Sequence, residues 1–450
     1  MLVLASWCIL LSSKNGITRL GVIGIALSTV IGSGVWKDSL LWSNSAGFFS
    51  LLAVFVGWLL MMTVGFSYAE CVGMFPQGGG PYSYVGGAFG KRAGAFTGLL
   101  FFGAYCFIGA ILSFLTSLFA LGALSYPTFV LLTTPNIVIL TAILIVVIGL
   151  FAGITPTRKF GFIALGWVIL KIVLVLGVFA FLFLSWTGPT GVVPSLNGLQ
   201  SAVNNSIWAL LGFELMLVFS GDMDKPEKDM PRSILLTLPV FLIVYFVVAL
   251  AASGRIAIGA IPSGTGTVGL LAMLASMTGV YGGLIFAFAA ISAAGTAYAI
   301  LGTMARQASI LAADGHLPAF LNKEKSGVKM NAGLVTTILV LIVGVVMTAT
   351  MDVWTTSVDM FAAAGIGLVL ISAMLPAGLT ALYLRVKMPA ISRPYKAPLH
   401  IVTFGLAVLL SLYLLYLNFA DVFAFWPAIL ISLIVIVLVL VANSLFRTKQ

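Results

Sequence analysis

The sequence predicts an all-α integral membrane protein with 12 transmembrane helices. Of its 450 residues 61% are hydrophobic and only 8% are charged, whereas about 25% of residues are charged in soluble domains. No soluble fold hides that much apolar surface. Apolar runs as long as a bilayer-spanning helix, about 20 residues, recur along the whole chain. Their length favours helices over the short alternating strands of a membrane barrel.

The apolar runs define the expected helices in chain order. They cover residues 17–42, 46–72, 96–124, 134–153, 160–185, 201–221, 233–254, 276–311, 332–350, 357–384, 401–419 and 425–446. We expect the first five in a unit over 17–186, the next five in a unit over 200–385, and a peripheral pair over 398–446. The apolar opening, residues 1–13, resembles the core of a signal peptide but lacks a preceding basic residue and a clear cleavage site. It is not assigned to the fold.

The basic residues give the orientation of these helices. With the N-terminus inside, 19 of the 22 lysines and arginines fall on the inner side, Arg255 falls outside, and Lys37 lies near the outer end of the first run. This asymmetry is the positive-inside pattern. The net charge of +10 therefore reports topology and gives no support for binding nucleic acid. It predicts a multi-pass protein of the cell membrane, with both termini in the cytoplasm.

Two of the runs are interrupted by glycine at corresponding positions of the two units. The first run contains "STVIGSGVW" (28–36), and the sixth contains "WALLGFELMLVFSG" (208–221). Small residues alone are typical of close helix packing. Paired interruptions five helices apart instead indicate an inverted-repeat transporter with a midplane site. Unwound backbone is tolerated at membrane depth only where it lines a protein cavity.

Two charged residues lie far inside predicted helices. Glu214 follows the second interruption, and Lys171 lies within "GWVILKIVLVLG" (166–177). A charge at the bilayer centre is costly, so each is expected to face a cavity and to have a partner. Glu214 is a candidate proton-binding group or a brace for the unwound segment. Lys171 lies too deep for its amine to reach an interface.

Other classes of function have less support. The three cysteines lie in apolar surroundings without metal-ligand spacing, and the two histidines are far apart. We therefore expect no metal, no cofactor and no catalytic cluster. A channel would also use buried charges but does not require paired broken helices. The glycine-rich segment 77–87 lacks the Gly-Lys-Ser/Thr of a phosphate loop. It is interpreted as an inner loop, with Glu70 beside it as an interfacial or bracing acid.

Six stretches in order resemble the amino acid–polyamine–organocation (APC) superfamily of transporters. They are "VIGSGVW" (30–36), "AECVGMFPQGGGPYSYVGGAFG" (69–90), "GFE" (212–214), "DKPEKDMPRS" (224–233), "LAADGHLP" (311–318) and "RPYKAP" (393–398). The resemblance implies a 5+5 inverted-repeat (LeuT-like) core with discontinuous helices 1 and 6. It also implies alternating-access transport of amino acids or related amines across a lipid bilayer, and it leaves a homodimer open.

The resemblance also implies where the substrate binds. The N–H groups of Gly32, Ser33 and Gly34, at the start of a half-helix, would hold its carboxylate, as the physics of helix N-termini favours. The substrate amine would meet freed carbonyl groups. Trp208 would either close over the substrate or serve as an interfacial belt residue. The positions that match the freed carbonyls are Val30, Trp208 and Leu211, and Tyr105 and Cys106 match binding positions in the third helix.

The coupling mechanism is left open. In sodium-independent superfamily members a lysine amine takes the place of a sodium ion beside helices 1, 5 and 8, and Lys171 resembles it. It would act as a switchable proton carrier or as a fixed cation. Glu214 matches an acid linked to proton coupling in members that exchange arginine for agmatine. Proton-coupled symport is the first expectation, and exchange of amino acids or amines is the alternative.

Specificity is expected to be neutral or broad. At two positions where the arginine/agmatine exchangers carry asparagine and tryptophan, this sequence has Ala110 and Ile300. Apart from Glu214, no acid is placed to pair with a cationic side chain. Because discrimination requires placed polar groups, these replacements argue against strict arginine specificity.

Overall fold

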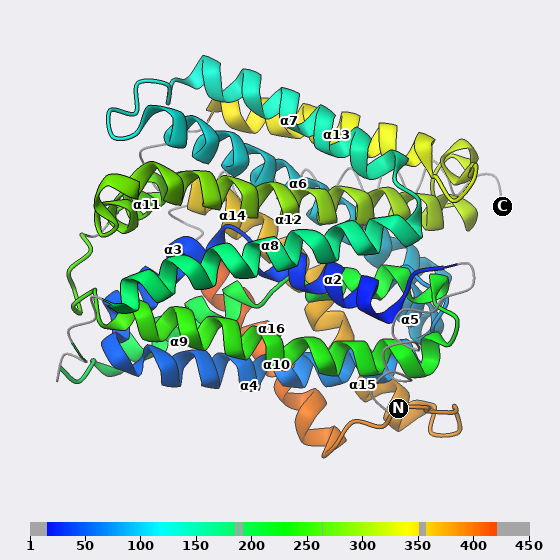
Figure 1. The fold of residues 1–450 in the computed structure, drawn as a ribbon. Helices are drawn as coiled ribbons and strands as arrows, with labels where there is room; N and C mark the ends of the chain where they lie inside the picture. The colour runs from blue at the N-terminus through cyan, green and yellow to red at the C-terminus, as the bar shows by residue number, and fades with distance from the viewer. Residues whose placement is uncertain (1–15, 185–187, 189–191, 263, 351–356, 421–450) are drawn as a thin grey trace, which may run out of the picture.

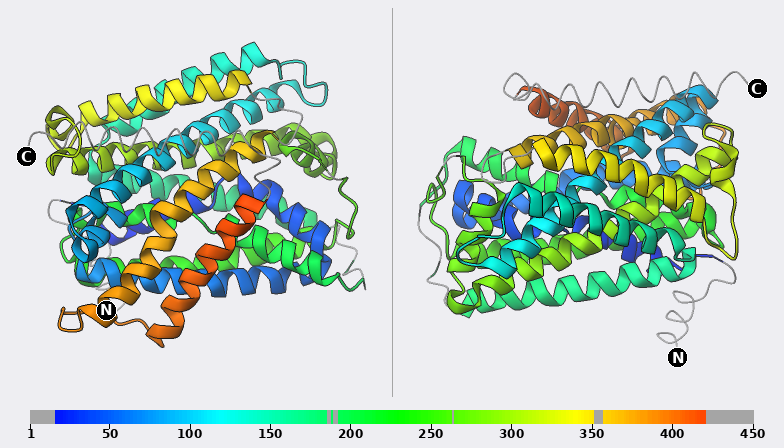
Figure 2. Two further views of the ribbon diagram at one scale, coloured as in Figure 1. Left: turned by 180° about the vertical axis from the view of Figure 1, so that it is seen from behind. Right: turned by 90° about the horizontal axis from the view of Figure 1, so that it is seen from above.

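The computed structural model describes residues 16–184, 188, 192–262, 264–350 and 357–420. Within these residues the chain is helical, and an isolated β-bridge between Lys325 and Val328 belongs to a loop. The long helices run roughly parallel to one another in one bundle (Figures 1 and 2). Ten helical stretches are long and apolar enough to cross a membrane. The prediction of an all-helical membrane protein is therefore confirmed for the described part of the chain.

Most of the predicted runs form continuous helices. These are α4 (Ser50–Met74), α6 (Lys91–Ser125), α7 (Thr134–Ile154), α8 (Thr157–Leu184), α10 (Pro226–Ser253), α12 (Gly282–Ala313), α13 (Met330–Thr350) and α16 (His400–Ala420). The run predicted at 425–446 lies outside the described residues, as does the opening segment 1–13.

Three runs are interrupted. The first consists of α2 (Arg19–Val30) and α3 (Gly34–Ala46), and the 3₁₀ turn η1 (Gly47–Phe49) leads from α3 into α4. The sixth consists of α9 (Leu196–Ala209) and the 3₁₀ helix η2 (Phe213–Asp222). The tenth runs through α14 (Ser357–Val369), the π-helical turn η5 (Leu370–Met374) and α15 (Leu375–Lys387).

Short helices occupy three connections for which the sequence predicted no helix. The inner segment forms α5 (Pro81–Phe89), which begins after three consecutive glycines with positive φ at 78–80. Proline suits the first turn of a helix because its missing N–H would have no partner there. The connection after α10 contains α11 (Thr267–Ser276) and η3 (Gly279–Tyr281), and η4 (Ala319–Asn322) follows α12. These helices are too short to give a membrane-spanning signal.

Helices that are five spans apart in the sequence pack against each other. Helix α4 contacts α10, α6 contacts α12, and α7 contacts α13. Glycines permit the closest of these approaches: a Cβ built on Gly153 of α7 would lie 2.8 Å from the Cα of Gly333 on α13. A Cβ on Gly161 of α8 would likewise lie 2.8 Å from the Cα of Gly21 on α2. Small residues at such crossings let backbones meet inside a membrane protein.

An ion-pair clamp joins the ends of two spans. Glu70 near the end of α4 is fully buried, and its carboxylate lies 2.6 Å from Nε of Arg385 on α15. The Nη2 of Arg385 donates a hydrogen bond to the second oxygen at 2.8 Å, as does the backbone N–H of Ala397, also at 2.8 Å. The Nε of Arg393 lies 3.5 Å away. Glu70 thus braces the fold, and the "RPYKAP" segment supplies two of its partners.

Candidate functional site

The first helix break lies in the middle of the bundle. Helix α2 ends at Val30, and the N–H of Gly32 donates to the carbonyl of Val30 at 2.8 Å in a tight turn before α3 begins at Gly34. A Cβ built on Gly32 would lie 3.0 Å from Oγ1 of Thr296 on α12. Ser33 is 8% exposed. The Gly-Ser-Gly element therefore forms a compact break enclosed by neighbouring helices.

The second break depends on a left-handed glycine. Helix α9 ends at Ala209, and Gly212 has a φ of 114° before η2 begins. Side chains rarely adopt that conformation, so glycine is favoured there. The N–H of Leu211 donates to the carbonyl of Trp208 at 3.3 Å. Both of those side chains are partly buried.

Two side chains join the breaks to each other. Thr29 Oγ1 lies 2.9 Å from the carbonyl oxygen of Gly212. Its one hydrogen is shared with the carbonyls of Ile25 and Ala26 in its own helix. The hydroxyl of Tyr245 on α10 lies 3.0 Å from the carbonyl oxygens of both Val30 and Ala209. The Val30 oxygen, expected to meet a substrate amine, is thus contacted by the protein itself. No feature of the sequence singled out Tyr245, which lies in an ordinary apolar helix.

Glu214 is held by neutral donors. Its carboxyl group is 1% exposed. The hydroxyl of Tyr105 donates to one oxygen at 2.5 Å, and the N–H of Gly212 donates to the other at 3.0 Å. Tyr105, expected to contact substrate, therefore binds this acid, and the adjacent Cys106 is buried on α6. The acid connects α6 to the second break.

Lys171 lies between the first, fifth and eighth spans. Its side chain is 0% exposed. The ammonium donates to the carbonyl of Ser28 at 2.7 Å, and it lies 3.2 Å from that residue's hydroxyl and 2.8 Å from Oγ1 of Thr296. In the described part of the chain no carboxylate forms an ion pair with it. All of its partners are neutral oxygens.

The backbone of α12 is shaped to admit this lysine. A Cβ built on Gly295 would lie 2.8 Å from Cε of Lys171 and 2.9 Å from the ring of Trp167. The carbonyl of Gly295 accepts the hydroxyl of Ser28 at 3.1 Å. Ser292 donates to the carbonyl of Gly32 at 2.9 Å. The same face of α12 therefore contacts both the lysine and the first break.

The structure thus brings the expected residues together in two groups. Lys171 is linked to the first break through α12, and Glu214 is linked to the second break directly. Sequence reasoning missed the connecting hydroxyls. Ser28 and Thr29 stand next to the glycines of the quoted stretch, whereas Ser292 and Thr296 are separated from them by more than 250 residues. The proximity of Ser28 and Thr29 to the Gly-Ser-Gly element was the one available signal.

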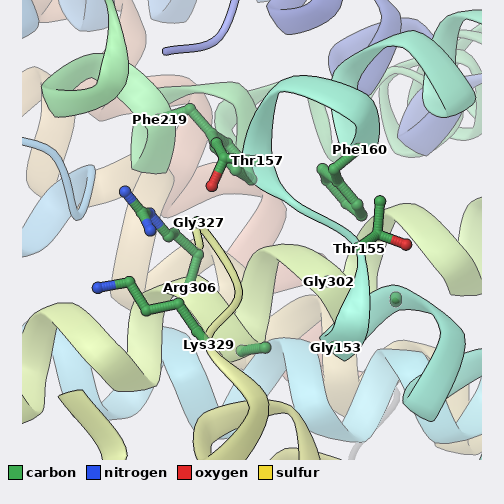
Figure 3. A pocket seen from close by; sticks show the side chains of 11 residues that line it. Gly153, Thr155, Thr157, Phe160, Phe219, Gly302, Arg306, Gly327 and Lys329 are labelled. Atoms are coloured by element: carbon green, nitrogen blue, oxygen red, sulfur yellow. The ribbon is translucent and has the colours of Figure 1, made fainter. Parts of the chain in front are cut away.

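A small pocket, partly open to solvent, lies where the α7–α8 connection meets α12 and the loop before α13, and Figure 3 shows its lining residues. Arg306 near the end of α12 pairs with Asp222 at the end of η2, and its Nη1 lies 3.9 Å from Glu324. The ammonium of Lys329 lies 2.7 Å from the same carboxylate. The lining comprises Ala152, Gly153, Thr155, Thr157, Phe160, Phe219, Gly302, Ala305, Arg306, Gly327 and Lys329.

The charges around this pocket perturb one another. Lys329 lies close to Glu324 and lowers the pKa of that carboxyl group, although partial burial acts in the opposite direction. On the other side of the same end, Tyr82 of α5 donates a hydrogen bond to Asp314 at 2.5 Å. This end of the bundle therefore carries its ion pairs on loops and helix termini.

Comparisons with known proteins agree with this arrangement. The profile of the "Amino acid permease" family matches residues 17–440. An uncharacterised protein of Methanocaldococcus jannaschii is 27% identical over 318 residues, covering 67% of this chain and 69% of the relative. An uncharacterised amino acid permease of Bacillus subtilis, YecA, is 26% identical over 348 residues, covering 75% and 78%. The chain belongs to the amino acid permease family, within the APC superfamily of transporters.

Proposed function

We propose that this protein is a sodium-independent secondary transporter that moves neutral or a broad range of amino acids by alternating access. The observation that carries the proposal is the pair of helix breaks, in the first and sixth spans, joined by Thr29 and Tyr245. Broken helices that face each other inside the bundle place backbone groups that can bind a polar substrate where lipid cannot reach them.

The proposed scaffold is a 5+5 inverted repeat with twelve spans, divided as 17–186, 200–385 and a peripheral 398–446. The packing of α4 on α10, α6 on α12 and α7 on α13 supports it, because each helix meets its counterpart five spans later. The basic residues support a cell-membrane protein with both termini in the cytoplasm.

The substrate carboxylate is proposed to bind at the start of α3, on the N–H groups of Ser33, Gly34 and Gly32, the last released from its 2.8 Å bond to the carbonyl of Val30. The positive end of that helix dipole favours an anion. The substrate amine would take the place of Tyr245 at the carbonyl of Val30, between Leu211 and Trp208 of the second break. Cys106 and Tyr105 would form part of the opposite wall.

Proton coupling is proposed to reside in Lys171, with Glu214 as the second candidate. Lys171 has only neutral partners in the described part of the chain, so nothing fixes its charge as an ion pair would. Such a lysine can release its proton when its surroundings change. Glu214 receives two hydrogen bonds and would respond to movement of η2.

One observation favours the alternative, an exchanger of cationic amino acids or amines. A Cβ built on Gly34 would lie 2.6 Å from a carboxylate oxygen of Asp38. This acid, which the sequence analysis did not consider, therefore lies beside the proposed carboxylate site, and Lys37 pairs with it at 2.8 Å. An acid in that place would attract a second positive charge on the substrate.

Uptake of labelled amino acids into proteoliposomes tests the proposal. Neutral amino acids should enter empty vesicles, faster with an inward proton gradient and equally well without sodium. Uptake only into vesicles preloaded with an amine would replace symport by exchange. Failure of every amino acid under both conditions would contradict the proposed function.

The Gly32→Val variant tests the binding site itself. The side chain would collide with Thr296, 3.0 Å from a Cβ at this position, and would cover the N–H groups at the break. We expect substrate binding to be lost while the protein is still produced and folded. Gly177→Val is the matched control, because a Cβ on Gly177 of α8 meets nothing within 4 Å. Retained substrate affinity in Gly32→Val would refute the carboxylate site.

A further inference from the structure

The pocket at the end of the bundle and the Lys171 site share the same two walls. Phe160 of α8 and Gly302 of α12 line the pocket (Figure 3). Further along these helices, Lys171 and Thr296 form the buried hydrogen bond described above. Eleven residues separate Phe160 from Lys171, which corresponds to about 16 Å along a helix axis. The pocket and the lysine therefore lie at two levels of one interface.

The residues between these levels form a narrow apolar column. Phe160, Ala164, Val168 and Lys171 recur at intervals of four, four and three residues, so they lie on one face of α8. All four are buried, with exposed fractions between 0 and 2%. None of the three residues on this α8 face below the lysine carries a polar side chain, and a proton or water molecule would have to pass them to reach the ammonium from the pocket.

The ring of Phe160 closes the pocket end of this column. It stacks on Phe219 of η2 with ring centres 5.6 Å apart and planes at 20°. It also contacts Tyr298 of α12, with centres 5.0 Å apart. A Cβ built on Gly302 would lie only 2.1 Å from the ring. The ring therefore packs directly on the backbone of α12. A larger residue at position 302 would displace it.

We propose that Phe160 is the residue that separates the solvent-open pocket from Lys171, and that water reaches the lysine from this side only when the ring leaves Gly302. The inference rests on the proposed function, because water access to Lys171 matters for transport only if this lysine is the coupling group. The movable partner is η2: Phe219 belongs to the broken sixth span, so a shift of that half-helix would remove one side of the stack.

A cysteine placed inside the column would measure this access without transport. In Ala164→Cys the thiol lies between Phe160 and Lys171. A membrane-impermeant, charged methanethiosulfonate reagent would be added to vesicles of each orientation, and Lys325→Cys, in an exposed loop near the pocket, would show which side the pocket faces. The same proteins without Ala164→Cys would measure the background labelling of the three native cysteines.

The expected result is slow labelling of Ala164→Cys and an increase of about tenfold or more when Phe160→Ala is added, because labelling no longer waits for local opening. Gly302→Ala should also accelerate labelling, because its methyl group displaces the ring. Phe162→Ala is the matched control: that ring lies two residues away on α8 and is 36% exposed. Its labelling rate should not change.

Fast labelling of Ala164→Cys alone, or an unchanged rate in both opening variants, would overturn the proposal. Size-exclusion chromatography would verify the folding of each variant. If Phe160→Ala does not fold, Phe160→Leu should give a smaller increase, since it removes the stacked ring but keeps bulk. Labelling requires neither substrate nor a proton gradient. Accelerated labelling without proton-dependent uptake would therefore support the role of Phe160 as the barrier, while contradicting the coupling role of Lys171.

Discussion

Glu70 and Lys171 are both fully buried ionisable residues, but their surroundings differ. Glu70 has the guanidinium groups of Arg385 and Arg393 and a backbone N–H around it, all from the segment that ends the tenth span and follows it. Among the described residues, Lys171 has only hydroxyl and carbonyl oxygens from the first and eighth spans around it. A charge compensated by opposite charges suits a fixed joint. A charge held by neutral groups between separate helices can change when those helices move.

The largest effect on stability is expected for Glu70→Gln. Removing the carboxylate leaves Arg385 without its counter-ion, and breaking one partner of a buried pair costs about 3–5 kcal/mol. The melting temperature in detergent should fall strongly. Glu324→Gln is the matched control, because its side chain is 41% exposed. A melting temperature close to that of the unchanged protein would show that the clamp does not stabilise the fold.

Lys171→Met should affect stability less and coupling more. Methionine keeps an unbranched apolar chain, while Ser28 and Thr296 keep their bonds to the carbonyls of Gly295 and Ser292. The loss should be about 1–3 kcal/mol, the range for a buried hydrogen bond broken on one side. Uptake should no longer respond to a proton gradient. A response that persists in this variant would transfer the coupling role to Glu214.

The smallest effect is expected at the Glu324–Lys329 pair. Lys329 lowers the pKa of Glu324 in the folded state. The pair therefore stabilises the protein above the ordinary Glu pKa of about 4.3, and this contribution disappears as the pH falls through the lowered value. Because the carboxylate is partly exposed, water screens the pair. In Glu324→Gln the melting temperature should fall slightly less steeply as the pH is lowered below the ordinary Glu pKa. An unchanged pH dependence would show that the pair does not contribute to stability.

The sequence located the two helix breaks and the two buried charges but not the contacts that connect them. Glycines inside an apolar run identify a break, and a lysine or glutamate inside such a run is conspicuous because its burial is costly. Both signals are local. Tyr245 and Thr296 stabilise the breaks across 215 and 268 residues of chain, and hydroxyl-bearing residues are common in membrane helices. Their roles therefore emerge only from the three-dimensional packing.

Specificity shows the same limit. Replacement of expected polar residues by Ala110 and Ile300 argued for neutral substrates, but Asp38 was overlooked because it follows Lys37 near the predicted end of the span. In the structure α3 begins at Gly34, so this acid lies about one turn from the break.

Tyr245 has one hydroxyl hydrogen but two carbonyl oxygens within reach. At any instant it donates to one of them, and the Val30 oxygen also accepts the N–H of Gly32 at 2.8 Å. In the binding mode proposed above, a substrate ammonium with three hydrogens would replace the tyrosine hydroxyl at these oxygens. The hydroxyl therefore competes with the substrate amine, and its release would be coupled to substrate binding. A Tyr245→Phe protein would lose that coupling.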